Sequence, residues 1–236
     1  MSRRTSVPAA TPDGAHPRGF VKSVRVSSHT VGAFQENCYL VVDETAGRAV
    51  IVDPGAEGER LVRAIRASGA QLEAIWLTHA HIDHIGAIAA VRREWPVPIL
   101  LHPADEPLYV RGAAQAAAYG LPFDDPPPAD EDLTDGATLT VGALEFSVLH
   151  TPGHAPGHCV FVGNGIVLAG DLLFAGSIGR TDLPLSDPRR MAESLARVAA
   201  LDPALAVYAG HGPATTIGRE LDTNPFLNGV ARVVRG

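Results

Sequence analysis

The chain has few cysteines, a deficit of positive charge and no long apolar run, and each shortage excludes a class of protein. Two cysteines among 236 residues cannot form a disulfide framework. No uninterrupted apolar stretch approaches the roughly 18 residues that a membrane span requires, and no segment resembles a secretory signal. The formal net charge of −7 argues against nucleic acid or an anionic membrane as the main partner. We therefore expect a soluble, cytoplasmic globular protein.

The composition otherwise fits one folded domain that follows a short tail. Apolar residues make up 46% of the chain and charged residues 19%, as in ordinary globular proteins. The first 20 residues contain three prolines and three arginines and have no apolar periodicity. They predict a disordered N-terminal tail over residues 1–20, with the folded domain over residues 21–236. The sequence leaves the oligomeric state open.

Short β-branched runs alternate with helical patterns along the domain. Strands are predicted over residues 21–26, 38–42, 49–52, 72–77, 97–101, 138–141, 145–149, 158–162, 166–169 and 206–208. Helices are predicted over residues 56–68, 84–94 and 188–200, and from residue 217 onward. This alternation predicts helices packed on sheets. Residues 112–132, with a proline run and an acidic cluster, predict a surface loop that edges a cleft.

The densest group of ligand-type side chains lies in the segment THAHIDH (78–84), just past the end of a predicted strand. Three imidazoles and one carboxylate packed this tightly can serve two neighbouring metal ions. Such ligands suit Zn²⁺, Fe²⁺ or Mn²⁺, and the absence of a nearby thiolate disfavours a structural zinc site. Further candidates follow later predicted strands, namely His154, Asp171 and His211. Open sheets build their sites at one rim in this way.

Several of these motifs, in this order, resemble the metallo-β-lactamase-fold hydrolases from residue 21 to the end. The matching segments are VDPG (52–55), THAHIDHIG (78–86), HTPGH (150–154), AGD (169–171) and AGHG (209–212). The segments LLFAGSIGRTDLP (172–184) and TNPFL (223–227) are most similar to the short glyoxalase II-like, or hydroxyacylglutathione hydrolase-like, subgroup. The resemblance implies an α/β (α+β) fold, an αββα sandwich in which two mixed sheets are flanked by helices.

The resemblance also implies a site with two divalent metal ions, with Zn²⁺ expected and Fe²⁺ or Mn²⁺ as alternatives. The first ion would be held by His79, His81 and His154. The second ion would be held by Asp83, His84 and His211, with Asp171 bridging the two. Asp83 and Asp171 would be the catalytic residues, and Asp53 would orient a ligand histidine through a hydrogen bond. Arg180 and Asn224 would contact the substrate, Arg180 by pairing with a carboxylate.

Other candidate residues have simpler interpretations. We expect His150 and His158 to make hydrogen bonds within a turn. Cys38 and Cys159 lie within predicted strands and are expected to be buried and inert.

The ligand set favours hydrolysis. Two divalent ions about 3.5–4 Å apart can share a water and lower its pKa toward neutrality. The implied enzyme is a binuclear metallohydrolase of a small-molecule thioester such as S-D-lactoylglutathione, with a metal-bridging hydroxide as nucleophile. Related metallo-β-lactamases usually have cysteine where Asp171 stands, which argues against β-lactamase activity. The helical domain that supplies much of the glutathione site in full-length glyoxalase II has no counterpart among the 25 residues after His211.

Two other functions remain open on the sequence. A mononuclear iron persulfide dioxygenase on the same fold, acting on glutathione persulfide, would hold its iron with His79, His154 and Asp171. The segment AGHGPAT (209–215) matches the hydrolases better. A non-catalytic metal-binding protein would be expected to have lost ligands, and none is missing here.

Overall fold

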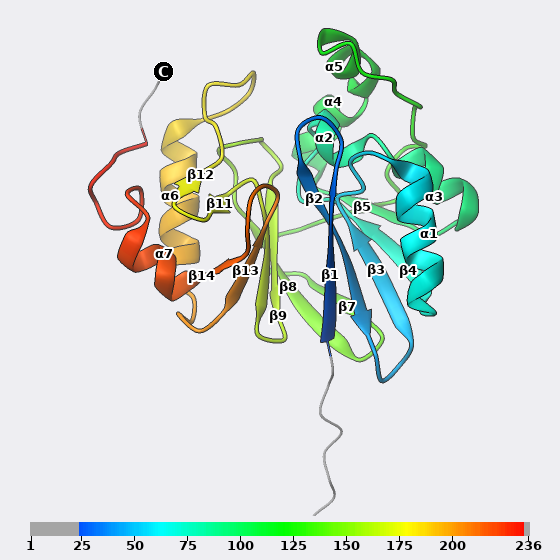
Figure 1. The fold of residues 1–236 in the computed structure, drawn as a ribbon. Helices are drawn as coiled ribbons and strands as arrows, with labels where there is room; N and C mark the ends of the chain where they lie inside the picture. Colours follow the sequence, from blue (N-terminus) through cyan, green and yellow to red (C-terminus); the bar gives the residue numbers. More distant parts are fainter. Residues whose placement is uncertain (1–23, 234–236) are drawn as a thin grey trace, which may run out of the picture.

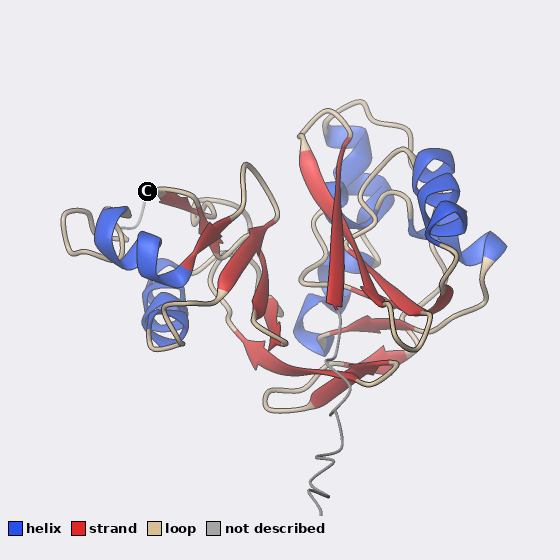
Figure 2. Ribbon diagram, turned by 60° about the horizontal axis from the view of Figure 1, so that its bottom comes forward, coloured by secondary structure: helices blue, strands red, loops and turns tan. Residues whose placement is uncertain are grey.

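The computed structural model describes residues 24–233, and the tail expected over residues 1–20 lies outside them. Two six-stranded sheets pack face to face, and helices cover both outer faces (Figures 1 and 2). The αββα sandwich with two mixed sheets is thereby confirmed. Over residues 24–233, no helix combines the length and the hydropathy that crossing a bilayer would require.

The N-terminal sheet has the strand order β1-β2-β3-β4-β5-β6. Its strands are β1 (Val24–Val31), β2 (Glu36–Asp43), β3 (Arg48–Val52), β4 (Gln71–Trp76), β5 (Ile99–Leu101) and β6 (Glu131–Asp132). The first three strands are antiparallel, and β3 to β6 are parallel. The parallel strands therefore end at a common edge, where the segments that follow β4 and β5 lie.

The C-terminal sheet has the order β14-β13-β10-β9-β8-β7, with only β10 and β13 parallel. Its strands are β7 (Thr138–Val141), β8 (Leu144–His150), β9 (Cys159–Gly163), β10 (Ile166–Gly170), β13 (Ala206–Ala209) and β14 (Thr215–Thr216). A separate two-stranded ribbon joins β11 (Leu173–Phe174) to β12 (Ser177–Ile178). The strands predicted over residues 138–149 and 158–169 are thus present, and each pair of them forms a hairpin.

The helices divide between the side of the N-terminal sheet and the side of the C-terminal sheet (Figure 1). On the N-terminal side they are α1 (Gly58–Ser68), α2 (Ile82–Ile85), α3 (Ile88–Glu94), α4 (Glu106–Tyr109) and α5 (Gly112–Ala118), with a short 3₁₀ turn over Pro103–Asp105. On the C-terminal side they are α6 (Pro188–Ala199) and α7 (Ile217–Thr223). α6 begins after Asp187, whose carboxylate accepts from the backbone N–H groups of Arg189 and Arg190, as a helix N-cap does.

The alternation of side chains along the strands builds three apolar layers. In β2, Cys38 and Leu40 pack toward the helices, whereas Tyr39 and Val41 pack toward the other sheet. The layer between the sheets centres on Trp76, which meets Phe146 and Phe161 edge to face, with ring centroids 5.6 and 5.4 Å away. A third layer lies between the C-terminal sheet and α6. Cys38 and Cys159 are buried free thiols within these layers.

The helix predicted over residues 84–94 is wrong as one element, because the chain forms α2 and α3 with a break between them. At the break the backbone of Gly86 packs against the backbone of Gly55, and a Cβ on Gly86 would lie 2.4 Å from the Gly55 carbonyl oxygen. The N–H of Ala87 donates to the carbonyl of Pro54 at 2.9 Å instead of continuing the helix. The break therefore fixes where α2 sits over the end of β4.

The surface loop predicted over residues 112–132 is also only partly right. The segment begins with helix α5 and ends with strand β6, which pairs with β5. α5 forms because residues 112–118 are mostly alanine, the strongest helix former, and alanine carries little apolar periodicity to reveal it. The segment does edge a cleft, since residues of α5 line the cavity that opens onto the candidate metal centre described below.

Candidate metal centre

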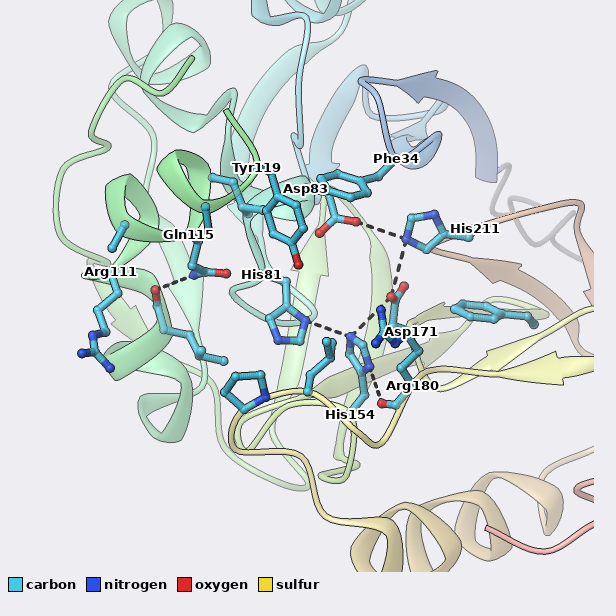
Figure 3. Close-up of a pocket in the computed structure, with 17 residues that line it drawn as sticks. Phe34, His81, Asp83, Arg111, Gln115, Tyr119, His154, Asp171, Arg180 and His211 are labelled. Atoms are coloured by element: carbon cyan, nitrogen blue, oxygen red, sulfur yellow. Dashed lines mark hydrogen bonds and ion pairs between the residues drawn. The ribbon is translucent and has the colours of Figure 1, made fainter. Parts of the chain in front are cut away.

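The candidate ligands converge at one rim of the sandwich, from segments that follow four different strands. Figure 3 labels five of them, His81, Asp83, His154, Asp171 and His211. The N-terminal sheet contributes the loop after β4 and the helix α2 that follows it. The C-terminal sheet contributes His154 after β8, Asp171 after β10 and His211 after β13. The site therefore lies where both sheets end, and neither sheet holds it alone.

Among residues 24–233, three groups of side chains have ligand atoms within 4.8 Å of one another. We call His79, His81 and His154 the first group and Asp83, His84 and His211 the second group. The remaining group, Asp53 with His79 and His84, includes the contact between Asp53 and His84 described below. In the first group, His81 Nδ1 and His154 Nε2 lie 2.8 Å apart. In the second, Asp83 Oδ2 lies 3.3 Å from His211 Nε2 and 3.8 Å from His84 Nε2. These are the two sets that the sequence resemblance implies.

Asp171 faces both groups from the end of β10. Its Oδ2 lies 3.4 Å from His154 Nε2 and 3.5 Å from His211 Nε2. Its Oδ1 lies 3.5 Å from His84 Nε2. One carboxylate is thus within reach of the first group and of the second.

Hydrogen bonds on the outer side of the rings fix which nitrogen faces the centre. His84 Nδ1 lies 3.0 Å from Asp53 Oδ2, and His154 Nδ1 donates to the Arg180 carbonyl at 2.8 Å. The Thr78 hydroxyl donates to Asp53 at 2.6 Å and is placed to accept from His79 Nδ1 at 3.1 Å. Such contacts set the tautomer of a ligating histidine and leave Nε2 free to bind.

The atoms that face the centre fit a metal better than they fit one another. His79 Nε2, His84 Nε2 and Asp171 Oδ1 are buried and have no hydrogen-bond partner among the described residues. Buried polar atoms are rarely left unpaired, because their desolvation costs free energy. Nitrogen and carboxylate oxygen donors are those that Zn²⁺, Fe²⁺ and Mn²⁺ accept. The residues present therefore fit divalent metal ions.

The pKa values of the histidines differ between the two groups: those of His79 and His81 are lowered, whereas that of His84 is raised. Burial lowers the pKa of His79 well below its usual value, and it lowers the pKa of His81 to about 3. Both rings are therefore neutral, which is the form that binds a metal. Burial also acts to lower the pKa of His84, but the carboxylates of Asp171 and Asp83 outweigh it and raise that pKa. Burial acts to raise the pKa of Asp171, and His84 beside it holds that pKa well below its usual range.

The two residues predicted to contact substrate lie in different surroundings. The exposed side chain of Arg180 lies at the edge of the pocket, where it forms a two-pronged ion pair with Asp182 at 2.9 Å. Asn224 is not among the residues that line the pocket, and its contact with substrate stays a prediction. Its side chain is 0% exposed and donates to the Ser177 carbonyl and to the Glu220 carboxylate. Asn224 therefore fixes the β11–β12 ribbon against α7.

His150 and His158 make turn hydrogen bonds, as expected, but His158 also supports the centre. The ring of His150 donates to the Pro156 carbonyl at 2.9 Å. His158 Nδ1 lies 2.9 Å from the Thr151 hydroxyl, and its Nε2 accepts from the backbone N–H of Asp171 at 3.0 Å. His158 therefore positions the backbone of the carboxylate that faces both groups.

Sequence reasoning missed Asp105, a buried carboxylate that ties two ligand-bearing loops together. It accepts from the N–H of Ala80, between two candidate ligands, and from the N–H of Gly157, in the loop after β8. Asp105 follows β5 as the other site residues follow their strands, so the strand-end rule could have found it.

Sequence reasoning also missed Asn37, whose amide joins the N-terminal sheet to the loop of His211. It donates to the carbonyls of Ala209 and Gly212 at 3.1 and 2.8 Å. No sequence signal pointed to Asn37, because its partners lie more than 170 residues away.

Gly210 lets this loop approach the centre closely. A Cβ on Gly210 would lie 2.2 Å from Asp171 Oδ1 and 2.9 Å from His84 Cε1, with no room for either to stay in place. Residue 210 must therefore be glycine, because any side chain there would overlap Asp171 and His84.

A cavity of about 520 Å³ opens onto the centre. Its floor contains His81, Asp83, His154, Asp171 and His211 (Figure 3). One wall is formed by α5, and the opposite side by the residues around Arg180. A cavity of this size accommodates a small molecule, with the polar groups gathered at its base.

Comparison with known proteins agrees with this arrangement. Residues 31–211 match the family profile described as the metallo-beta-lactamase superfamily. Hydroxyacylglutathione hydrolase GloC of Haemophilus influenzae is 38% identical, over 84% of this chain and 95% of its own length. Two solved structures superpose well, the BLEG-1 B3 metallo-beta-lactamase (38% identity, TM-score 0.81, 86% and 99% of the two chains) and TTHA1623 in a di-iron-bound form (45%, 0.79, 86% and 100%). The chain therefore belongs to the metallo-beta-lactamase superfamily and is a metallohydrolase of that superfamily.

Proposed function

We propose that the protein hydrolyses a small-molecule thioester, such as S-D-lactoylglutathione, with two divalent metal ions. The observation that carries the proposal is Asp171, whose two oxygens face both groups of candidate ligands. A site for a single ion needs only one group of ligands, whereas here Asp171 faces the first group through His154 and the second group through His84 and His211. The likeness to a hydroxyacylglutathione hydrolase supports the choice of a thioester.

In this proposal His79, His81 and His154 hold one ion, Asp83, His84 and His211 hold the other, and Asp171 contacts both. When bound, the ions would polarise the substrate carbonyl and activate a water at neutral pH. Zn²⁺ is the first choice, and the di-iron form of TTHA1623 makes Fe²⁺ the second. Asp53 and the Arg180 carbonyl keep the ring nitrogens turned inward, so that the ligand set needs little rearrangement.

The reaction that we propose consumes one water. Its oxygen forms the new bond to the acyl carbon, the carbon–sulfur bond breaks, and the products are a carboxylate and a thiol. Asp83 and Asp171 are the carboxylates within reach of this water, and both lie at the floor of the cavity. Of the two protons of the water, one ends on the sulfur of the leaving thiol and the other passes to solvent through the open mouth.

His211→Ala tests the two-ion proposal, because His211 belongs only to the second group. We expect the parent to hold close to two metal ions per chain and to hydrolyse thioester without consuming O₂. The variant should lose metal and about 10²–10³ in rate, as when one electrostatic element of a site is removed. His29→Ala is the matched control, since this histidine lies on β1 outside both groups.

Three assays on the same preparations separate the alternatives. They measure thioester hydrolysis, O₂ uptake with glutathione persulfide, and opening of a β-lactam, the last because of the likeness to BLEG-1. If His211→Ala keeps one iron and most of an O₂-consuming activity, the protein is a persulfide dioxygenase and the hydrolase proposal is wrong. β-Lactam opening without thioester hydrolysis would also refute the proposed substrate.

A further inference from the structure

Helix α5 forms a fixed wall of the cavity above the candidate metal centre. Arg111, Gln115 and Tyr119 are spaced four residues apart, so they lie along one face of the helix, and all three line the cavity. The Gln115 amide donates to the carbonyl of Ala80 at 3.0 Å, within the ligand-bearing loop, and to that of Leu108 at 2.8 Å. The distance between the wall and the centre is therefore held by direct hydrogen bonds.

Two exposed aromatic rings meet at the top of this wall. Phe34, from the turn between β1 and β2, and Tyr119, at the end of α5, pack edge to face with centroids 5.0 Å apart and planes at 86°. Phe34 is 37% exposed and Tyr119 is 57% exposed. Figure 3 shows both rings at the cavity, on the side that carries Asp83. Rings of this size are usually buried, so an exposed pair facing a candidate site is surface that a bound ligand would cover.

The surroundings of the pair are apolar and roomy. Leu108, Ala114 and Ala118 line the same wall, and Leu183 and Pro184 line the cavity as well. Two arginines also line the cavity, Arg111 beside α5 and Arg180 on the opposite side, where it is paired with Asp182. A second cavity of about 470 Å³ lies on the other side of Phe34 and shares Ile82 and Asp83 with the first. An uncharged group of some size fits this surface better than a small polar one.

We propose that Phe34 and Tyr119 are specificity-determining residues that select thioesters with an aromatic or branched apolar acyl group. This inference rests on the proposed function and narrows its substrate class. Burial of a phenyl group against two rings is expected to favour phenylacetyl over acetyl thioesters of the same thiol by about tenfold to a hundredfold in kcat/KM.

The first test compares this preference among variants of the metal-loaded enzyme. Phe34→Ala and Tyr119→Ala should each reduce the phenylacetyl preference at least threefold, mainly through KM. Tyr119→Phe keeps the ring and should keep the preference. Val110→Ala is the matched surface control, because Val110 is 70% exposed beside α5 but does not line the cavity.

The second test does not need turnover. Calorimetry compares the binding of phenylacetate and acetate to the metal-loaded protein, with phenylacetate expected to bind at least tenfold more tightly in the parent and not in Tyr119→Ala. Hydrolysis with no acyl preference, and equal binding of the two carboxylates, would overturn the inference and leave the proposed function standing. Tighter phenylacetate binding that depends on Tyr119, without any thioester hydrolysis, would support the apolar site and refute the proposed function.

Discussion

Gly210→Ala should weaken metal binding far more than it weakens the fold. The new methyl carbon would lie 2.2 Å from Asp171 Oδ1, at least 0.8 Å inside the 3.0 Å that Cβ atoms keep from other heavy atoms. Either Asp171 or the end of β13 must therefore move by about that distance, whereas metal–ligand distances tolerate only about 0.2 Å. We expect metal affinity to fall at least 10–100-fold, as for changes that disturb ligand positions. The overpacking should cost the metal-free fold only about 1–3 kcal/mol.

Competition with a chromophoric chelator measures the metal Kd, and urea unfolding of the metal-free protein measures the cost to the fold. Gly212→Ala is the control, two residues along the same loop. Gly212 has φ +77° and no atom within 4 Å of its Cβ position, so the variant adds backbone strain of about 1–2 kcal/mol without a clash at the centre. The reasoning is refuted if Gly210→Ala binds metal as tightly as Gly212→Ala does.

Three further predictions concern catalysis, the core and pH. Asp171→Ala should abolish thioester hydrolysis in a steady-state assay, and a near-parental rate would remove Asp171 from the site. Trp76→Ala should lower the free energy of unfolding in urea by about 3–5 kcal/mol, because it empties the layer between the sheets; a loss below about 1 kcal/mol would contradict that packing. Burial raises the pKa of Asp105 to about 6, so its contribution to stability is greatest below pH 4 and falls by about 3 kcal/mol as the pH rises through 6. Unfolding of the metal-free protein across this range should show that slope, and Asp105→Asn should flatten it.

The sequence predicts the fold well because the strands carry two different apolar faces. Both sheets are mixed and both are buried on two sides, so β2 and β10 read as continuous apolar runs bounded by turns. The candidate ligands were predictable for a related reason. Each follows a strand, and strands of two packed sheets bring their ends to one rim.

Residues that act through space rather than through a motif escaped prediction. Asn224 lies in a segment typical of the subgroup, but that motif does not reveal that its amide donates to the Ser177 carbonyl and to the Glu220 carboxylate. The pairing of Phe34 with Tyr119 joins a β-turn to a helix end 85 residues away, and neither has a sequence signal of its own. The break between α2 and α3 depends on contact with the backbone of Gly55, and the pattern of apolar residues along the helix carries no information about such a contact.

The two hydrogen bonds from the Asn37 amide to the carbonyls of Ala209 and Gly212, called here the Asn37 clamp, bear on how the chain folds. These hydrogen bonds close loops of 172 and 175 residues, and closing a loop of that length costs about 4–5 kcal/mol of chain entropy. The clamp can form only after most of the intervening chain is ordered, so the two sheets should fold first and dock late. Metal ions held by side chains from both sheets would act on this final step as a cross-link. Metal binding would then add its free energy to the docked arrangement of the two sheets, before any substrate is present.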